Sequence, residues 1–205
     1  MPNKASQRDQ KTAASLWFFG PCWRRYGRYQ MNEKLNHLKW VLVDQIVDLT
    51  IATTAIRDHI DAPNFQPESQ KSIAYFRMCS NSLIVSLSKL WEALDHYGKE
   101  INEFPEELKI NCRALKSEIE RKKIYQFRSK YAAHIIDKDT KKPISLVEGE
   151  KRYSSIVGEN IGDLINFCDW IIPENYNKNP KSVMNTVERT RDYCLSIVGS
   201  SAERP

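Results

Sequence analysis

The sequence predicts an all-α protein, a bundle of five to six helices. Apolar residues recur at spacings of three and four over most of the chain, the period of a helix that buries one face. Glycine is scarce, with 7 among 205 residues, and charged residues make up 28%, a composition that favours long, surface-exposed helices over a sandwich or barrel. Each apolar stripe needs another for burial, so the helices are expected to pack as one bundle.

The first two helices are expected to be long. The first begins near Met31 and keeps helical spacing for about 30 residues, until Pro63 and Pro67 open a short loop. The second runs from about Pro67 to Tyr97, and Gly98 provides a stop at its C-terminus. Their stripes contain Leu35, Leu38, Leu42, Ile46, Leu49, Thr53, Ile56 and Ile60 in the first helix, and Ile73, Phe76, Ser80, Leu83, Leu87, Leu90, Trp91 and Leu94 in the second.

A third helix is expected to start at Pro105, because proline suits the first turn of a helix. Its stripe spans residues 108–119. A further helix follows, with Ile124, Phe127 and Tyr131 on its apolar face. This fourth helix is either continuous with the third or broken near Lys122.

The C-terminal part of the chain is expected to hold two more helices. The polar run 138–143 reads as an exposed turn, and residues 144–147 as a short extended segment. Helical spacing then returns over 157–171 and again over 183–197.

The chain divides into an N-terminal tail (1–30), a helical domain (31–198) and a C-terminal tail (199–205). Basic and aromatic residues alternate between Trp23 and Tyr29, a pattern that can stack on and neutralise single-stranded nucleic acid. Two other interpretations stay open: a flexible tail, or sequence upstream of a true start at Met31. The apolar run 16–19 is shorter than a signal-peptide core, so export is not expected.

The cysteines and histidines give no support to a metal centre or a cofactor. The five cysteines are odd in number, far apart and without a C-x-x-C pair, so buried thiols in a reducing cytosol are expected. The four histidines never pair at ligand spacing. No apolar run approaches the roughly 18 residues of a membrane span, and the net charge of +5 permits RNA as a partner without requiring it. The cysteines are Cys22, Cys79, Cys112, Cys168 and Cys194.

The segment from Phe127 to His134 carries the clearest chemical pattern. Arg128 and His134 stand six positions apart on the expected fourth helix. On a regular α-helix Tyr131 neighbours both of them, because residues three apart share a diagonal row. A fixed cation beside a group that titrates near neutrality suits chemistry at a phosphodiester. A histidine on an apolar stripe is also compatible with a hydrogen-bonded core residue. The pattern alone therefore does not decide between a catalytic and a structural histidine.

Other candidates lie nearby. Asp95 and His96 read either as an acid–base couple or as part of a helix end, and Tyr131 either packs in the core or donates its hydroxyl to the site. No glycine-rich phosphate loop, G-x-S-x-G or H-E-x-x-H motif is present in the sequence. The basic residues that flank the motif are candidates for gripping RNA phosphates, with ordinary surface charge as the alternative. They are Arg121, Lys122, Lys123, Lys130, Lys141 and Lys142.

The segment that contains Arg128 and His134 also carries a family resemblance. Arg128-x5-His134 resembles the R-x(4–6)-H signature of the HEPN superfamily of small helical ribonucleases. The run from Phe127 to Leu146 is similar to the equivalent segment of abortive-infection HEPN proteins of the AbiU type, as is the second-helix stretch Asn81–Glu92. The resemblance covers about residues 31–198.

The resemblance implies metal-independent RNA cleavage by a cytoplasmic toxin or phage-defence effector. The 2′-hydroxyl of RNA is the nucleophile, His134 acts as general base or acid, and Arg128 holds the phosphate. Ser129 and Tyr131 serve as orienting groups. Family members commonly pair two motif helices across a homodimer, and a regulatory partner or antitoxin is a further expectation.

An alternative function stays open. Active family members often carry Asn, Asp or His directly after the arginine, where this chain has Ser129. The chain can therefore also be an inactive HEPN-type module that binds RNA, a nucleotide or a partner protein. HEPN toxins silenced by nucleotidylation usually have tyrosine two positions after the histidine; Ile136 stands there, so that control is not expected.

Overall fold

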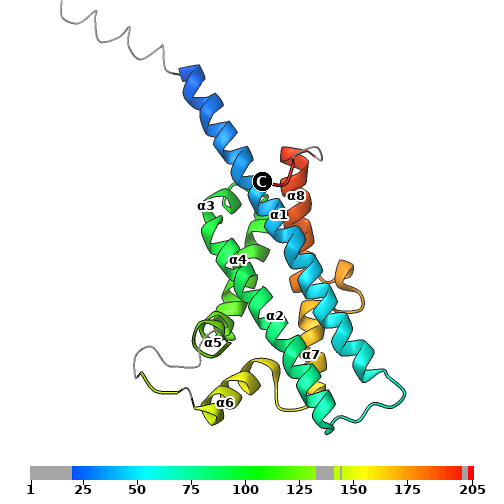
Figure 1. Cartoon of the computed structure of the whole chain (residues 1–205). Helices are drawn as coiled ribbons and strands as arrows, with labels where there is room; N and C mark the ends of the chain where they lie inside the picture. Colours follow the sequence, from blue (N-terminus) through cyan, green and yellow to red (C-terminus); the bar gives the residue numbers. More distant parts are fainter. Residues whose placement is uncertain (1–19, 133–140, 144, 200–202) are drawn as a thin grey trace, which may run out of the picture.

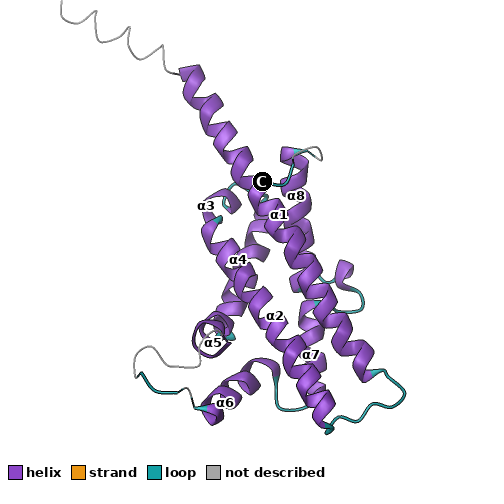
Figure 2. Ribbon diagram, in the orientation of Figure 1, coloured by secondary structure: helices purple, strands orange, loops and turns teal. Residues whose placement is uncertain are grey.

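The computed structural model describes residues 20–132, 141–143, 145–199 and 203–205, with side chains from Gln30 onward except those of Tyr131, Ala132 and Leu146. Within these ranges the protein is a helical bundle without a β-strand, which confirms the all-α prediction (Figure 2). Six helices have 11 or more residues, in line with the expected five to six. Two further α-helices have only four residues each.

Three helices form the centre of the bundle: α1 (Gly20–Ile60), α2 (Gln70–His96) and α8 (Val183–Val198). Helix α1 packs along both α2 and α8 (Figure 1). Leu38 and Leu42 of α1 are fully buried, as their place on the apolar stripe predicts. Helix α1 starts at Gly20, 11 residues before the expected start at Met31. Its first part extends beyond the bundle (Figure 1).

The chain continues into α3 (Gly98–Ile101) and α4 (Glu106–Arg121). Helix α2 ends at His96, within one residue of the expected end at Tyr97, but Gly98 opens the extra turn α3 and does not act as the expected glycine stop. A glycine stop needs a positive φ, and among the described glycines only Gly158 and Gly199 have one. Pro105 directly precedes α4, as expected.

Helix α3 is tied to α1 by a buried carboxylate. Lys34 Nζ donates to Glu100 Oε1 at 2.7 Å, and Glu100 is buried. Burial raises the pKa of Glu100, but the hydrogen bond and the charge of Lys34 outweigh this and hold the pKa below its ordinary value. The pair therefore fixes the turn between α2 and α4 against the central helix.

Helices α6 (Leu146–Val157) and α7 (Ile161–Ile171) correct the expectation for this part of the chain. The predicted extended segment 144–147 is wrong at its last two residues, which open α6. Ser145 caps α6 by accepting a hydrogen bond from the backbone N–H of Glu148. Val157, expected to start a helix, is the last residue of α6. The sequence between 148 and 155 is mostly polar, so the apolar period is weak there.

Gly158 separates α6 from α7. Its φ is +103°, and a Cβ at this position would lie 1.9 Å from the Cβ of Asp163. Asp163 cannot retreat, because its N–H donates to the capping Oδ1 of Asn160 at 3.0 Å. Only glycine fits this turn without a local shift.

We expect Gly158→Ala to destabilise the protein by about 1–3 kcal/mol, since it combines backbone strain with a steric clash. Gly199→Ala is the matched control, because Gly199 also has a positive φ (+82°) but open space where its Cβ would stand. Urea denaturation of both variants gives the two free energies of unfolding. Equal losses would show that the clash with Asp163 contributes nothing.

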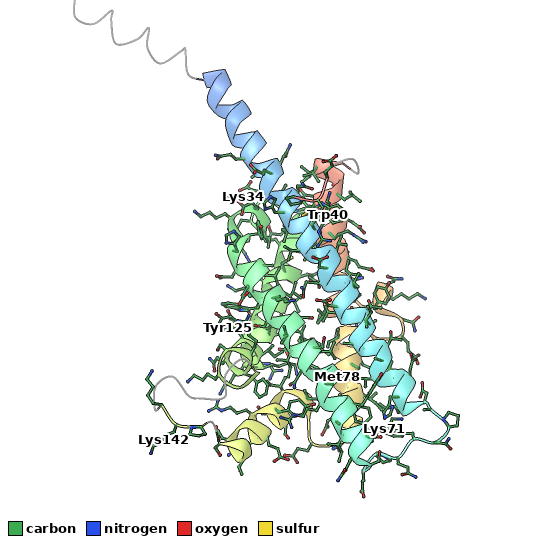
Figure 3. All side chains as sticks on the ribbon, in the orientation of Figure 1. Lys34, Trp40, Lys71, Met78, Tyr125 and Lys142 are labelled. Atoms are coloured by element: carbon green, nitrogen blue, oxygen red, sulfur yellow. The ribbon has the colours of Figure 1, made fainter. Side chains whose placement is uncertain are left out.

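The C-terminal residues return to α1. Asn36 Nδ2 and Trp40 Nε1 both donate to the backbone oxygen of Glu203, at 2.9 and 3.2 Å. Arg204 pairs with Asp44 at 2.5 Å. The expected C-terminal tail thus has at least these two residues fixed on the central helix, near Trp40 as labelled in Figure 3.

The described thiols are free and buried, as the sequence predicts. Burial raises the pKa of Cys168 and of Cys194 to about 12, which keeps both protonated and unreactive. The side chain of Cys22 lies outside the described residues. None of the helices that the structure describes is long and apolar enough to cross a membrane.

Candidate functional site

The motif segment is separated from α4 by a sharp break. Helix α4 ends at Arg121, Lys122 caps it, and Lys123 has a left-handed backbone with φ 57°. The short helix α5 (Ile124–Phe127) then begins. Of the two interpretations left open by the sequence, the structure supports the break near Lys122.

The motif residues do not continue as a regular α-helix. Arg128–Ala132 form a π-helical segment, η1. In a π-helix the hydrogen bonds join residues five apart, so the turn is wider than in an α-helix. The expectation that Arg128 and Tyr131 share an α-helical diagonal row is therefore wrong. Single π turns occur frequently at functional sites.

Buried side chains of α5 hold this segment on the bundle. Ile124 is fully buried and Phe127 is 8% exposed. Helix α5 packs on α2, and the ring of Phe127 lies 6.3 Å from that of Tyr153 in α6. The π segment thus starts from a fixed base, and within it Lys130 is exposed and Arg128 is half-buried.

Arg128 makes a loose ion pair with α2. Its Nη1 lies 3.7 Å from Oε1 of Glu92, and the two side chains are 38% and 45% exposed. An exposed pair of this length contributes at most about 1 kcal/mol. The guanidinium is therefore positioned by Glu92 but remains able to exchange this partner for a phosphate.

Ser129 is engaged locally. Its hydroxyl donates to the backbone oxygen of Gln126 at 3.2 Å. This is a short-range contact that satisfies a carbonyl at the end of α5. The orienting role expected from the resemblance would require the hydroxyl to leave it.

Two of the six predicted RNA-binding cations are occupied elsewhere. Arg121 makes two hydrogen bonds to Glu118, at 2.8 and 2.6 Å. Lys122 lies over the ring of Trp170, 5.1 Å from its centroid, and burial lowers its pKa. The other four, Lys123, Lys130, Lys141 and Lys142, are exposed, and Figure 3 shows Lys142 at the outer edge of the molecule.

Two predicted site groups lie outside what the structure describes: His134, and the side chain of Tyr131. The distance from His134 to Arg128 thus stays a prediction. Arg128 and Lys130 share one short segment, whereas Lys141 and Lys142 follow in a separate described stretch.

A cleft beside Glu92 was not anticipated from the sequence. It has a volume of about 680 Å³ and is bounded by residues of α1, α2 and α5. Trp91 and Tyr125 belong to its wall, with ring centroids 4.5 Å apart. Trp91 stands on the expected helical stripe, so the sequence indicated only a core role. The lining residues are Val41, Asp44, Gln45, Lys89, Trp91, Glu92, Ala93, Asp95, His96, Tyr97 and Tyr125.

Asp95 and His96 both lie on this cleft. Asp95 Oδ1 accepts a hydrogen bond from Lys116 Nζ at 2.7 Å, and the His96 ring stands edge-on to Tyr97 at 4.7 Å. The first contact joins the end of α2 to α4, whereas the second joins two consecutive residues at that end. Within the described part of the chain, no group of three or more His, Cys, Asp or Glu residues is arranged to hold a metal ion.

The fold and the motif segment define a helical bundle with a basic π turn on its surface. No protein-family model and no curated protein matches the chain. A solved structure is similar: the integron cassette protein Vpc_cass2 from the mobile metagenome of V. paracholerae. It is 26% identical, with a TM-score of 0.61 over 79% of this chain and 96% of that one.

Proposed function

We propose that this protein is a metal-independent endoribonuclease of the HEPN type, acting in the cytoplasm as a toxin or phage-defence effector. The observation that carries the proposal is the π segment. It sets Arg128 on the surface in a loose pair with Glu92, six residues before His134. The R-x5-H pattern and the AbiU-like sequence around it supply the reaction class.

In the proposed reaction the 2′-hydroxyl of RNA attacks the adjacent phosphorus, so the protein supplies proton transfer and charge stabilisation. His134 removes the hydroxyl proton or protonates the leaving 5′-oxygen. Arg128 leaves Glu92 and donates to the non-bridging oxygens, where negative charge develops. Lys130, exposed in the same segment, adds positive charge beside the phosphate.

We also propose that two subunits form one shared basic cleft around their motif segments. One copy offers few polar groups: Arg128 and Lys130 are at the surface, but Ser129 bonds to its own backbone. A second copy would double the positive charge that a phosphate meets. Light scattering should show a dimer at micromolar concentration; a monomer alone would contradict the shared site.

The second candidate function is an inactive HEPN-type module that binds RNA, a nucleotide or a partner protein such as an antitoxin. The engaged hydroxyl of Ser129 favours it, since this residue stands where active members often carry Asn, Asp or His. Growth on induced expression separates the two. Toxicity that disappears in His134→Ala supports the enzyme, whereas equal growth effects of both chains support the binding module.

The chemistry itself gives the decisive experiment. We expect the purified protein to cleave structured RNA in the presence of EDTA and to leave 2′,3′-cyclic phosphate or 3′-phosphate ends. DNA of the same sequence should stay intact, because it lacks the attacking 2′-hydroxyl. End-group analysis of labelled RNA and DNA measures both. Products with 5′-phosphate ends, or cleavage that requires a divalent ion, would contradict the mechanism.

A further inference from the structure

The cleft beside Arg128 is suited to a nucleobase. We propose that it is the base-binding subsite of the RNA site and that it prefers guanine. This inference rests on the proposed function and adds to it a substrate preference. The cleft's volume of about 680 Å³ lies within the usual range of small-ligand sites. Glu92 connects the cleft with the proposed phosphate-binding residue, because it lines the cleft and pairs with Arg128.

The aromatic wall of the cleft is held in place before any ligand arrives. Trp91 Nε1 donates to Glu120 Oε1 at 2.9 Å, and Lys116 Nζ lies 5.3 Å from the Trp91 ring centroid. Tyr125 packs on the same indole, and both rings are partly exposed. Figure 3 shows Tyr125, a residue of α5, at the edge of the bundle. Partly exposed, fixed aromatic rings are the surfaces on which proteins stack unpaired RNA bases.

The charges of the cleft fit a base better than a phosphate. Each of its three carboxylates is paired: Asp44 with Arg204 at 2.5 Å, Glu92 with Arg128 at 3.7 Å, and Asp95 with Lys116 at 2.7 Å. The cleft therefore does not present a block of uncompensated negative charge to RNA. For the phosphate, Arg128 is available beside the cleft, because it pairs with the lining residue Glu92.

Glu92 is the carboxylate most easily released, since its contact with Arg128 is long and exposed. When a phosphate takes Arg128, the oxygens of Glu92 become free to accept hydrogen bonds from a base. Guanine presents two parallel donors, N1–H and the N2 amino group, which match a carboxylate. Uracil presents one N–H between two carbonyl oxygens, and these would face the carboxylate unfavourably. Guanine is thus the expected base.

The test uses the full chain and the mononucleotides GMP and UMP, with binding followed by ligand-observed NMR. We expect GMP to bind about tenfold more tightly than UMP, the scale of a bidentate base contact. Glu92→Gln should abolish this preference, because an amide replaces one acceptor oxygen by a donor. Tyr125→Leu should weaken both nucleotides by about tenfold through loss of stacking.

Glu174→Gln is the control, since Glu174 lines a second cleft of about 660 Å³ elsewhere on the protein. It should leave GMP binding unchanged. Equal affinity for GMP and UMP, or an unaltered preference in Glu92→Gln with a native circular dichroism spectrum, would overturn the inference. So would tighter binding of an arginine-rich peptide, which would assign the cleft to a basic partner.

RNA cleavage measured on the same samples separates this inference from the proposed function. Cleavage without any guanine preference overturns the base subsite and leaves the ribonuclease. Selective GMP binding that depends on Glu92, without cleavage, supports the cleft as a nucleotide site and overturns the enzyme.

Discussion

Replacing His134 by alanine is expected to slow RNA cleavage by about 10²–10⁴-fold, the usual contribution of a general acid or base. RNA binding should change little, because the proposed phosphate contacts come from Arg128 and Lys130. Gel-shift and cleavage assays on the same RNA measure the two effects separately. The matched control is His37→Ala, since His37 is an exposed histidine of α1 away from the motif segment.

Two further observations test the same site. The cleavage rate should vary with pH near neutrality, because an unperturbed imidazole has a pKa of about 6.5. Arg128→Lys should also reduce the rate, since an ammonium cannot reproduce the planar, two-point contact of a guanidinium with a phosphate. Equal activity of the wild type and His134→Ala on several structured RNAs would end the enzyme proposal and leave the binding module.

Truncating a buried leucine at the centre of α2 should have the largest effect on stability. Leu87 is completely buried between the helices, so Leu87→Ala removes apolar contacts and leaves a cavity. The expected loss is about 2–5 kcal/mol in the free energy of unfolding. Because α5 packs on α2, the motif segment of Leu87→Ala should unfold at a lower denaturant concentration than that of the wild type.

Ile73→Ala provides the comparison within the same helix. Ile73 is 55% exposed, and alanine is a better helix former than isoleucine, so stability should change by less than about 0.5 kcal/mol. Urea denaturation followed by circular dichroism measures both variants. A loss for Leu87→Ala no greater than that for Ile73→Ala would mean that α2 is not packed as the structure has it.

In the motif segment the sequence pattern predicts the buried residues but not the backbone conformation. The stripe residues Ile124 and Phe127 are buried, as their spacing predicts. The left-handed backbone of Lys123 and the π turn from Arg128 have no such signal, because lysine rarely adopts a positive φ and a π turn has no residue signature of its own. Packing of α5 against α2 decides both.

Helix α6 illustrates the same limit. A short helix that buries only one turn carries too few apolar residues to establish a period, and Ile156 and Val157 are its buried pair. Its start depends on Ser145, whose capping role becomes visible only once the following residues are helical. The need for glycine at position 158 comes from Asp163, which lies across the turn where a Cβ would stand.

The sequence by itself determined the all-α class, the long helices and the candidate pair Arg128 and His134, because helical periodicity and motif spacing are local properties of the chain. Only the tertiary structure decided that Glu92 reaches Arg128, that Lys122 turns to Trp170, and that a cleft opens beside Trp91. These contacts join residues of different helices. Side-chain packing between the helices fixes them, and no spacing along one helix contains that information.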